Sequence, residues 1–411
     1  MASPSSIVIV GASLAGATAA QTLREEGFTG RITLIGDEAH RPYERPPLSK
    51  GYLLGDTDRE KVFVHPGDWY DEHDIDLRLG TAAARVDRDA RNVVLADGSR
   101  LGYDALLLTT GSSPRRLQVA GADLDGVLYL RRLEDSERLR AAFGRAARAV
   151  IIGAGWIGLE VAAAARAAGL DVTVLEQAEL PLLRVLGRDA ARVFADLHRD
   201  HGVDLRCSAQ VKAITGGDDR VNGVTLGDGS RLDSDLVLVG VGITPNVHLA
   251  ADAGLETDNG VVVDEHLRTA DRVVYAAGDV ASAYHPGLAR RIRVEHWANA
   301  RRQGAVAAKT MLGQDVVYDR LPYFFSDQYD LGMEYTGFVD PDAYDQVVFR
   351  GDVAGREFIA FWLADGRVLA GMTVNTWGVT DAVEGLVRSG QPVDPHRLGD
   401  PSIPLDAVLT R

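Results

Sequence analysis

Cysteine is almost absent from this sequence. Its 411 residues include a single cysteine, Cys207, so neither an intramolecular disulfide nor a CxxC redox pair can form. This excludes the disulfide framework of small secreted domains, and such a low cysteine content fits a reducing cytoplasm. The dithiol relay of disulfide reductases is excluded for the same reason.

Long apolar runs, excess positive charge and clustered metal ligands are also missing. No apolar stretch approaches the ~20 residues needed to span a bilayer, and residues 1–6 lack the basic start of a signal peptide. The net charge of −15 argues against a general affinity for nucleic acid. The ten histidines form no HxxxH motif or His/Cys cluster, so we expect no metal site. We expect a cytoplasmic protein that binds neither membranes nor nucleic acid.

What the sequence does contain is a nucleotide-binding pattern in residues 149–177. An apolar run predicts a buried strand, GAGWIG at 153–158 predicts a tight turn, and an alanine-rich helix and a second strand ending at Glu176 follow. The glycines let the backbone approach a pyrophosphate at the helix N-terminus, and the acidic residue can bind ribose hydroxyls. Because a carboxylate would repel a 2′-phosphate, we expect NAD(H) rather than NADP(H).

The same pattern occurs a second time near the N-terminus. A strand at 6–10 leads into GASLAG at 11–16, a helix to about Glu26 and a strand at 31–35 that is followed by Asp37 in the ribose position. Ser13 replaces the middle glycine, but a serine is small and can hydrogen-bond a phosphate. Two such sites most simply mean one bound flavin dinucleotide and one exchangeable nicotinamide dinucleotide.

Three further segments carry signals for the flavin site. The prolines between 42 and 47 forbid a regular helix, so we expect a stiff loop that holds Ser49 and Lys50 over a flavin; a solvated basic loop is the alternative. A strand over 103–109 ends in a Gly/Ser/Pro cluster, and the similar exit of the strand over 236–241 suggests internal duplication. A strand over 273–277 ends in Gly278 and Asp279, and we expect a helix to follow it.

These motifs resemble, in order and over nearly the whole chain, the bacterial flavoprotein ferredoxin reductases of the putidaredoxin-reductase and biphenyl-dioxygenase-reductase type. The matching segments are 11–16, 45–50, 110–111, 129–131, 153–160, 278–279, 295–297 and 326–329. The resemblance implies an α/β, glutathione-reductase-like fold with two Rossmann-type dinucleotide-binding domains plus a C-terminal α+β domain. The FAD-binding domain would comprise 1–114 and 242–320, the NAD-binding domain 115–241, and the C-terminal domain 321–411.

The resemblance also implies which residues bind the cofactors. The FAD contacts would be Gly11, Ser13, Leu14, Ala15, Gly16, Asp37, Arg45, Pro47, Lys50, Ala83, Thr110, Gly111, Arg131, Gly278, Asp279, Glu295, His296 and Trp297. The NAD contacts would be Gly153, Gly155, Trp156, Ile157, Gly158, Glu160, Glu176 and Gly242.

Two side chains are candidates for the chemistry itself. We expect Lys50 and Glu160 to pair beside the flavin N5, where an ammonium can stabilise the reduced ring and the carboxylate can position the nicotinamide carboxamide or hold the lysine. A structural ion pair between domains is the alternative. Tyr323 and Phe325 stand where the family commonly has tryptophans, which argues against an indole relay there. We expect Trp362 and Trp377 to lie in the core.

Electrons must then leave the flavin directly for an external acceptor. A cluster within 285–304, consisting of Arg290, Arg291, Arg293, Arg301 and Arg302, can steer an acidic ferredoxin; a solvated helix start is the alternative. We predict an NADH-dependent FAD enzyme that reduces a two-iron ferredoxin, which the resemblance links to a haem-thiolate monooxygenase or a Rieske dioxygenase. The alternatives are a rubredoxin reductase, an NADH oxidase, or a redox-sensing binding protein like the apoptosis-inducing flavoproteins.

Overall fold

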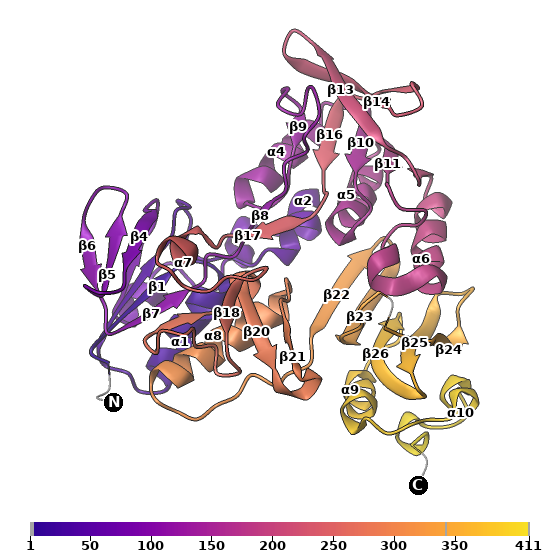
Figure 1. The fold of residues 1–411 in the computed structure, drawn as a ribbon. Helices are drawn as coiled ribbons and strands as arrows, with labels where there is room; N and C mark the ends of the chain where they lie inside the picture. Colours follow the sequence, from indigo (N-terminus) through magenta and orange to yellow (C-terminus); the bar gives the residue numbers. More distant parts are fainter. Residues whose placement is uncertain (1–3, 342, 410–411) are drawn as a thin grey trace. The chain divides into compact units, whose positions relative to one another are not determined.

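The computed structural model describes residues 4–341 and 343–409, which form two compact units (Figure 1). The first unit contains the chain up to Arg45, residues 58–113 and residues 243–322. The second contains residues 46–57, 114–242 and the chain from Tyr323 onward. The short segment 46–57 thus belongs to a different unit from the residues on either side of it.

The first unit is built on a parallel sheet whose order is β19-β7-β1-β2-β3. Its strands are β1 (Ser6–Val10), β2 (Arg31–Ile35), β3 (Ile75–Arg78), β7 (Ala105–Leu108) and β19 (Val274–Ala276). All residues of β1 and β7 are buried, as expected for central strands covered on both faces. Helices α1 (Leu14–Glu25) and α8 (Trp297–Met311) pack against each other, and Gly304 lets them approach, since a Cβ there would lie 2.4 Å from the Ala15 carbonyl oxygen.

Smaller elements complete the first unit. One is an antiparallel sheet of β4 (Ala83–Asp87), β5 (Asn92–Leu95) and β6 (Arg100–Gly102). The others are η2 (Arg59–Val62), α3 (Trp69–Glu72), β8 (Ser112–Pro114, whose last residue belongs to the second unit), β17 (Ile243–Pro245), α7 (His248–Asp252), β18 (Val261–Val263), η3 (Gly278–Val280), β20 (Ala281–His285), η4 (Pro286–Leu288) and β21 (Arg290–Ile292).

The prediction of a helix after Asp279 is wrong. A single 3-10 turn, η3, is followed by β20, which pairs in parallel with β18 and antiparallel with β21. Pairing with strands distant in sequence therefore decides the conformation of residues 281–292. The next helix, α8, begins only at Trp297.

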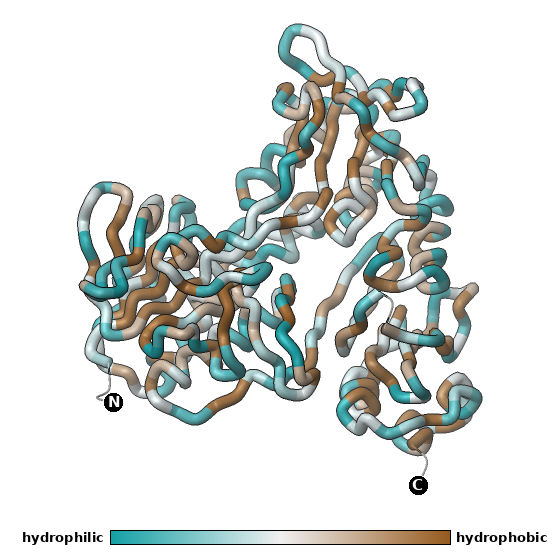
Figure 2. Tube along the Cα trace, viewed as in Figure 1, coloured by the Kyte–Doolittle hydropathy of each residue, from teal (hydrophilic) through white to brown (hydrophobic). Residues whose placement is uncertain are grey.

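The second unit contains a parallel sheet of the same kind, with order β12-β11-β10-β16-β9. Its strands are β9 (Val127–Leu128), β10 (Arg148–Ile152), β11 (Asp171–Leu175), β12 (Asp204–Arg206) and β16 (Leu236–Val239), and its helices are α4 (Leu133–Phe143), α5 (Trp156–Ala167) and α6 (Leu183–Asp200). Hydrophobic residues follow the central strands of both parallel sheets (Figure 2). The two predicted strand–turn–helix–strand units are therefore confirmed.

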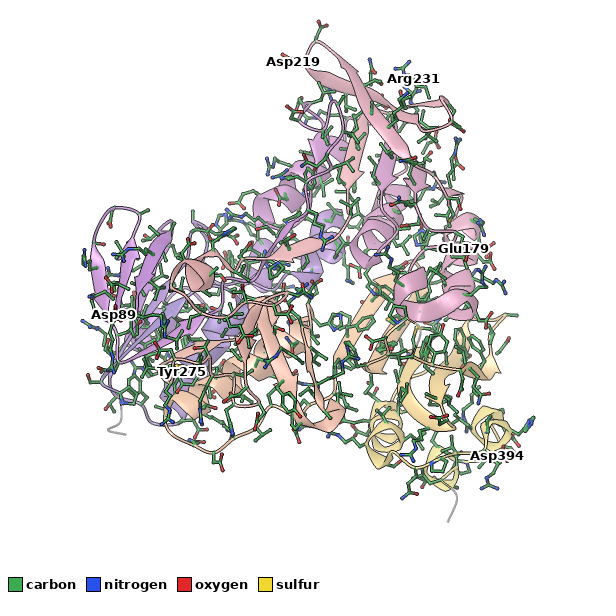
Figure 3. All side chains as sticks on the ribbon, in the orientation of Figure 1. Asp89, Glu179, Asp219, Arg231, Tyr275 and Asp394 are labelled. Atoms are coloured by element: carbon green, nitrogen blue, oxygen red, sulfur yellow. The ribbon has the colours of Figure 1, made fainter. Side chains whose placement is uncertain are left out.

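An antiparallel sheet adjoins this parallel sheet. It consists of β13 (Val211–Gly217), β14 (Arg220–Leu226) and β15 (Arg231–Asp233). Figure 3 labels Asp219 in the turn before β14 and Arg231 at the start of β15. Segment 46–57 forms a 3-10 turn, η1 (Pro46–Ser49), and one helical turn, α2 (Gly51–Leu54).

The C-terminal part of the second unit is a five-stranded antiparallel sheet with order β22-β23-β26-β25-β24. The strands are β22 (Tyr323–Gln328), β23 (Leu331–Gly337), β24 (Gln346–Asp352), β25 (Glu357–Ala364) and β26 (Arg367–Val374), and α9 (Thr380–Ser389), α10 (Pro395–Gly399) and η5 (Leu405–Ala407) follow. Trp362 is fully buried, as expected. Trp377 is 59% exposed because it lies in the turn after β26, so its predicted core position is wrong.

Candidate functional site

The first glycine-rich turn lies at the carboxyl end of β1. Gly11 has φ +122°, and a Cβ there would lie 2.2 Å from the Thr109 carbonyl oxygen. A Cβ on Gly16 would lie 2.3 Å from the Gly11 carbonyl oxygen. Ser13, in contrast, has the extended backbone φ −121°, ψ −178°, which any residue adopts. The turn therefore requires its first and third glycines but not a glycine in the middle.

Two other strand ends meet this turn. In a parallel sheet the carboxyl ends of β1, β7 and β19 lie at one edge, and the point where the strand order reverses is the usual ligand crevice. The Ser112 hydroxyl, beyond β7, donates to Asp279 Oδ2, beyond β19, at 2.8 Å. A Cβ on Gly278 would lie 3.2 Å from the Ala15 Cβ. The structure thus brings the predicted residues of segments 11–16, 110–111 and 278–279 to one edge.

Arg45 belongs to the same neighbourhood. Its guanidinium lies 3.2 Å from the Glu38 carboxylate. Burial opposes the charged form, but Tyr43, Glu38 and Asp279 together raise the pKa of Arg45. A permanently charged guanidinium is suited to bind a phosphate at this edge.

The acidic residue after β2 does not occupy the position expected from the second unit. Parallel pairing places Val10 opposite Ile35, and the residue that follows Ile35 is Gly36. A Cβ on Gly36 would lie 2.5 Å from the Ala12 Cβ, so no side chain fits there. The exposed Asp37 is one residue further on. The Gly36 carbonyl accepts from the amide of Thr81, which is two residues before the predicted contact Ala83.

The start of α8 contributes His296 and Trp297. His296 is the N-cap residue, and burial lowers its pKa to about 4 against the opposing charge of Asp279. Its imidazole is therefore neutral at pH 7. The Arg301 guanidinium lies 4.7 Å from the centre of the Trp297 ring, and Glu295 pairs with Arg293 at 2.5 Å.

The five arginines of the predicted docking patch differ in environment. Arg291 donates to the Val263 and Ser282 carbonyls, and Arg293 donates to the Asp279 carbonyl. Arg302 donates to the Leu321 carbonyl at 3.1 Å. Arg290 and Arg301 are exposed. Three of the five guanidinium groups thus hydrogen-bond backbone carbonyls of their own unit, and the other two are the most exposed of the patch.

The second glycine-rich turn has the same backbone requirement and more space. A Cβ on Gly153 would lie 2.4 Å from the Gly240 carbonyl oxygen, and one on Gly158 would lie 2.1 Å from the Gly153 carbonyl oxygen. Gly155 has φ −79° and ψ 179°, and a Cβ there would meet no atom within 4 Å. The open space beside Gly155 is therefore of the kind that a pyrophosphate fills at a helix N-terminus. Ile157, in the first turn of α5, is 45% exposed.

Glu176 lies directly after β11 and is tied to this turn. Its Oε2 accepts from the Ala154 amide and its Oε1 from the Ala178 amide, both at 2.8 Å. Each carboxylate oxygen has a further lone pair, so ribose hydroxyls can bind in addition. Gly242, with φ +100°, follows β16 at the same edge of the sheet.

Trp156 is placed differently from the other predicted NAD contacts. Its ring packs edge-on against Phe194 of α6 at 5.3 Å and against Phe324 of β22 at 5.2 Å between ring centres. The half-buried indole thus packs against the apolar core of the unit.

The structure brings Lys50 and Glu160 together in the second unit. The Lys50 ammonium lies 2.7 Å from Glu160 Oε2, and the Glu160 side chain is 4% exposed. The Ser49 hydroxyl donates to the same oxygen, and the Ser326 hydroxyl donates to Oε1 at 2.7 Å. Three donors thus converge on one buried carboxylate.

Segment 46–57 is held in place by α4. The Ser136 hydroxyl donates to the Leu48 carbonyl at 2.8 Å, and the Tyr52 hydroxyl bonds Glu137 at 2.7 Å. Leu53 is buried in the apolar core of the unit. These contacts fix the position of Lys50. Pro47 and Arg131 also belong to the second unit, and their contacts with FAD stay predictions.

The two residues at the tryptophan positions have specific partners. The Tyr323 hydroxyl donates to Glu334 Oε1 at 2.6 Å, and the Thr380 hydroxyl donates to Oε2 at 2.6 Å. The Lys50 ammonium lies 5.7 Å from the centre of the Phe325 ring, within cation–π range. Desolvation raises the pKa of the neighbouring Asp327, and Glu160 and Glu334 add to the rise against Lys50.

Sequence reasoning missed the partners that hold Glu160. Ser326 and Gln328 were part of the family match but had no assigned role, and His198 was not singled out. Side chains alternate between the two faces of a strand, so residues 324, 326 and 328 share one face. In β22 these three are buried, whereas 323, 325 and 327 are not. Within residues 4–341 and 343–409, no group of three His, Cys, Asp or Glu side chains is arranged to hold a metal ion. No helix of this described part is long and apolar enough to cross a membrane.

Comparison with known proteins gives full-length matches. The pyridine nucleotide-disulphide oxidoreductase family matches residues 5–304, and the reductase C-terminal family matches residues 323–409. Rhodocoxin reductase of Rhodococcus erythropolis is 42% identical over 406 residues, which cover 99% of this chain and 95% of that protein. The ferredoxin–NAD(+) reductase component of the anthranilate 1,2-dioxygenase system of Burkholderia cepacia is 40% identical over 409 residues, covering 98% of each. The solved covalent complex of putidaredoxin reductase with putidaredoxin superimposes with a TM-score of 0.93 at 38% identity, covering 98% of both chains.

Proposed function

Because the chain belongs to the pyridine nucleotide-disulphide oxidoreductase family, and within it to the ferredoxin reductases, we propose that it passes electrons from NADH through FAD to a two-iron ferredoxin. It is an oxidoreductase that uses FAD and NAD(H), and its predicted glutathione-reductase-like α/β fold is confirmed. The observation that carries the proposal is the pair of glycine-rich turns, each at the carboxyl edge of its own parallel sheet. When bound, FAD takes a hydride from NADH and gives up electrons singly to an iron–sulfur carrier.

The first unit supplies the FAD site in this proposal. The turn at 11–16 and the amides of α1 bind the pyrophosphate, and the Arg45 guanidinium neutralises it. Asp37 binds the adenosine ribose, with Ala83 beside the adenine. Asp279 binds the ribityl chain with its remaining lone pairs, next to the neutral His296.

The second unit supplies the NAD site. The open space at Gly155 receives the pyrophosphate, and Glu176 binds the ribose and repels a 2′-phosphate. Ile157 offers an apolar surface to the bound nucleotide.

Lys50 and Glu160 have the chemical role in this proposal. The ammonium of Lys50 is held by a buried carboxylate, so it is desolvated enough to act strongly on nearby developing charge. We place it beside N5 of the flavin, with Glu160 fixing its position. The cation–π contact with Phe325 limits the directions in which the ammonium can move.

The ferredoxin docks, in this proposal, on the exposed Arg290 and Arg301, and it serves a haem-thiolate monooxygenase or a Rieske dioxygenase. With one cysteine in the chain there is no dithiol to carry electrons onward, so the acceptor takes them directly from the flavin. We further propose a cytoplasmic location and the division into an FAD domain (1–114, 242–320), an NAD domain (115–241) and a C-terminal domain (321–411).

Anaerobic stopped-flow absorbance of the FAD-loaded protein tests this function. NADH is expected to bleach the flavin band much faster than NADPH, and a two-iron ferredoxin is expected to couple the reduced protein to cytochrome c. A purified protein without a flavin spectrum would refute the assignment. Fast bleaching without ferredoxin-dependent cytochrome reduction would favour an NADH oxidase or a redox sensor.

A further inference from the structure

A chain of buried polar side chains runs from Glu160 to helix α6. The Ser326 hydroxyl donates to Glu160 Oε1 at 2.7 Å, and Gln328 Nε2 donates to the Ser326 hydroxyl oxygen at 3.1 Å. Gln328 Oε1 lies 2.9 Å from His198 Nε2. All four side chains are at most 4% exposed. Polar groups buried so completely are costly unless each bond is made.

The elements that carry this chain fix its geometry. Glu160 lies one turn after Trp156 on α5, and His198 lies one turn after Phe194 on α6. Trp156 packs on Phe324, the first buried residue of β22, while Ser326 and Gln328 follow it on the same face of that strand. Helices α5 and α6 and strand β22 therefore meet. The apolar contact of Trp156 lies at one end of this junction and the polar side chains lie at the other.

The orientation of the Gln328 amide sets the direction of the hydrogen bonds on either side of it. A carbonyl oxygen only accepts, so His198 Nε2 must carry the proton and Nδ1 must be the acceptor. The Tyr329 hydroxyl lies 3.4 Å from Nδ1, and burial raises the pKa of Tyr329, so this hydroxyl keeps its proton. Burial lowers the pKa of His198 to about 4, so its ring is neutral at pH 7. Each donor from Tyr329 to Ser326 thus points toward Glu160.

This series of hydrogen bonds can hold the Glu160 side chain in position, but it cannot transfer a proton. An amide in the middle of the chain does not exchange its protons between its two ends as a hydroxyl or imidazole does. The Gln328 amide can only be held in one of two orientations. In the observed one its NH2 group faces Ser326, which leaves the Ser326 proton for Glu160. In the flipped one its oxygen would take that proton.

We propose that His198 is a positioning residue for the electron-transfer site: through Gln328 and Ser326 it holds Glu160 in the single orientation that presents Oε2 to Lys50. This rests on the proposed function, because the ion pair is assigned there to hydride transfer. Without the donor of His198, the Gln328 amide is free to flip, Ser326 turns to it, and the carboxylate loses one of its three donors. The Lys50 ammonium then loses its fixed position.

The limiting rate of flavin reduction by NADH, measured by anaerobic stopped flow on the FAD-loaded protein, tests the proposal. Ser326→Ala is expected to lower that rate roughly tenfold while the NADH dissociation constant changes less than about twofold. Ser326→Thr, which keeps the hydroxyl, is expected to restore most of the rate. His198→Phe is expected to lower the rate about fivefold.

The double variant carries the decisive comparison. If His198 acts through Ser326, then combining His198→Phe with Ser326→Ala is expected to be no slower than Ser326→Ala alone. Multiplicative losses would show that His198 acts independently and would overturn the proposal. Gln328→Glu is a second route if the His198 variant does not fold, because the new carboxylate still accepts from His198 but takes the Ser326 proton. It is expected to be as slow as Ser326→Ala.

A control and a measurement without turnover complete the test. Ser234→Ala removes another fully buried hydroxyl of the same unit, one that donates to the Leu236 carbonyl, and is expected to leave the rate unchanged. In ¹⁵N-histidine NMR spectra, the signals of His198 are those present in the parent protein and absent in His198→Phe. They are expected to be those of a neutral ring protonated at Nε2. A ring protonated at Nδ1 would overturn the proposal. If the parent protein is not reduced by NADH, the proposed function fails; if it is reduced and Ser326→Ala is equally fast, only this inference fails.

Discussion

The two glycine-rich turns of this chain differ at three places, and the differences separate what the backbone requires from what the chemistry requires. The first and third glycines are common to both turns, because a Cβ at any of the four would collide with backbone. The middle position is Ser13 in one turn and Gly155 in the other, and both have extended backbones. A glycine there provides room for a ligand and is not needed for the turn itself.

The second difference is the acidic residue that follows the second strand of each unit. Glu176 bonds the Ala154 amide, whereas the matching position in the first unit is Gly36. The third is two residues beyond the last glycine, where α5 has Glu160 and α1 has Thr18. The helix that follows the second turn thus carries one member of the candidate catalytic pair, and the helix that follows the first turn has no carboxylate at that position.

The largest effect is expected where the helices differ. Glu160→Gln keeps the shape but removes the charge that holds Lys50, so the rate of flavin reduction by NADH is expected to fall about 100-fold with FAD still bound. The matched change in the first unit, Thr18→Ala, is expected to stay within about twofold of the parent. Stopped-flow measurement of the rate of flavin reduction by NADH in both variants tests this expectation. Equal rates for Glu160→Gln and the parent would remove the ion pair from the chemistry.

A second comparison concerns two histidines, His296 in the first unit and His198 in the second, whose pKa values desolvation lowers to about 4. Between about pH 6.5 and pH 4, the unfolded chain binds protons that these native rings do not. The free energy of unfolding is therefore expected to decrease as the pH falls, by about 2 kcal/mol per histidine at pH 5.

Urea unfolding at pH 7 and pH 5 measures this loss. In His198→Phe the difference between the two pH values is expected to shrink by about 2 kcal/mol. Replacement of the exposed His396 by glutamine serves as the control and is expected to leave the difference unchanged. An unchanged difference in the His198 variant would contradict the expectation.

Exchange of the middle residues tests the role of space in the turns. Gly155→Ser is expected to weaken NADH binding about tenfold, or about 1.4 kcal/mol, because the side chain occupies the open region. Its thermal stability is expected to match the parent, since no atom lies within 4 Å of the added Cβ. Ser13→Gly is expected to retain FAD. Titration with NADH and measurement of the flavin content test these expectations. If the middle residue shaped the turn itself, Gly155→Ser would lose thermal stability and Ser13→Gly would lose FAD.

The smallest effect is expected at the acidic residues. Glu176→Gln removes the charge that opposes a 2′-phosphate, so the ratio of kcat/KM for NADH to that for NADPH is expected to fall about threefold. Asp37→Asn changes the acidic residue one position beyond the matching site in the first unit and is expected to leave this ratio unchanged. A change in the ratio caused by Asp37→Asn would reverse the assignment of the two sites.

The sequence allowed accurate prediction of the parallel strands and their turns, because these depend on local patterns. Residues 6–10 and 31–35 are strands with the predicted bounds, and the glycine spacing located both turns. Features that depend on distant pairing were not predictable in this way. Residues 281–292 form a hairpin because β18 is available as a partner, and Trp377 is exposed because its strand ends before it.

The pairing of Lys50 with Glu160 was predictable from the sequence, but the other hydrogen bonds of that carboxylate were not. Lys50 and Glu160 were named from the sequence, but nothing local to Glu160 indicates that Ser326, 166 residues away, donates to it. The same holds for the arginines. The run of positive charge predicts a docking surface, but it does not indicate that Arg291, Arg293 and Arg302 also donate to backbone carbonyls.

The assignment of segment 46–57 to the second unit limits how this protein can be divided. A shortened chain limited to residues 114–242 and 323–411 has most of the second unit but lacks Lys50 and Ser49. Its Glu160 would keep Ser326 as a donor and lose its cation, which leaves a buried charge without compensation. We therefore expect the second unit to depend on residues 46–57, from the first 60 positions of the chain, for the cation and one of the hydroxyl groups that its buried carboxylate binds.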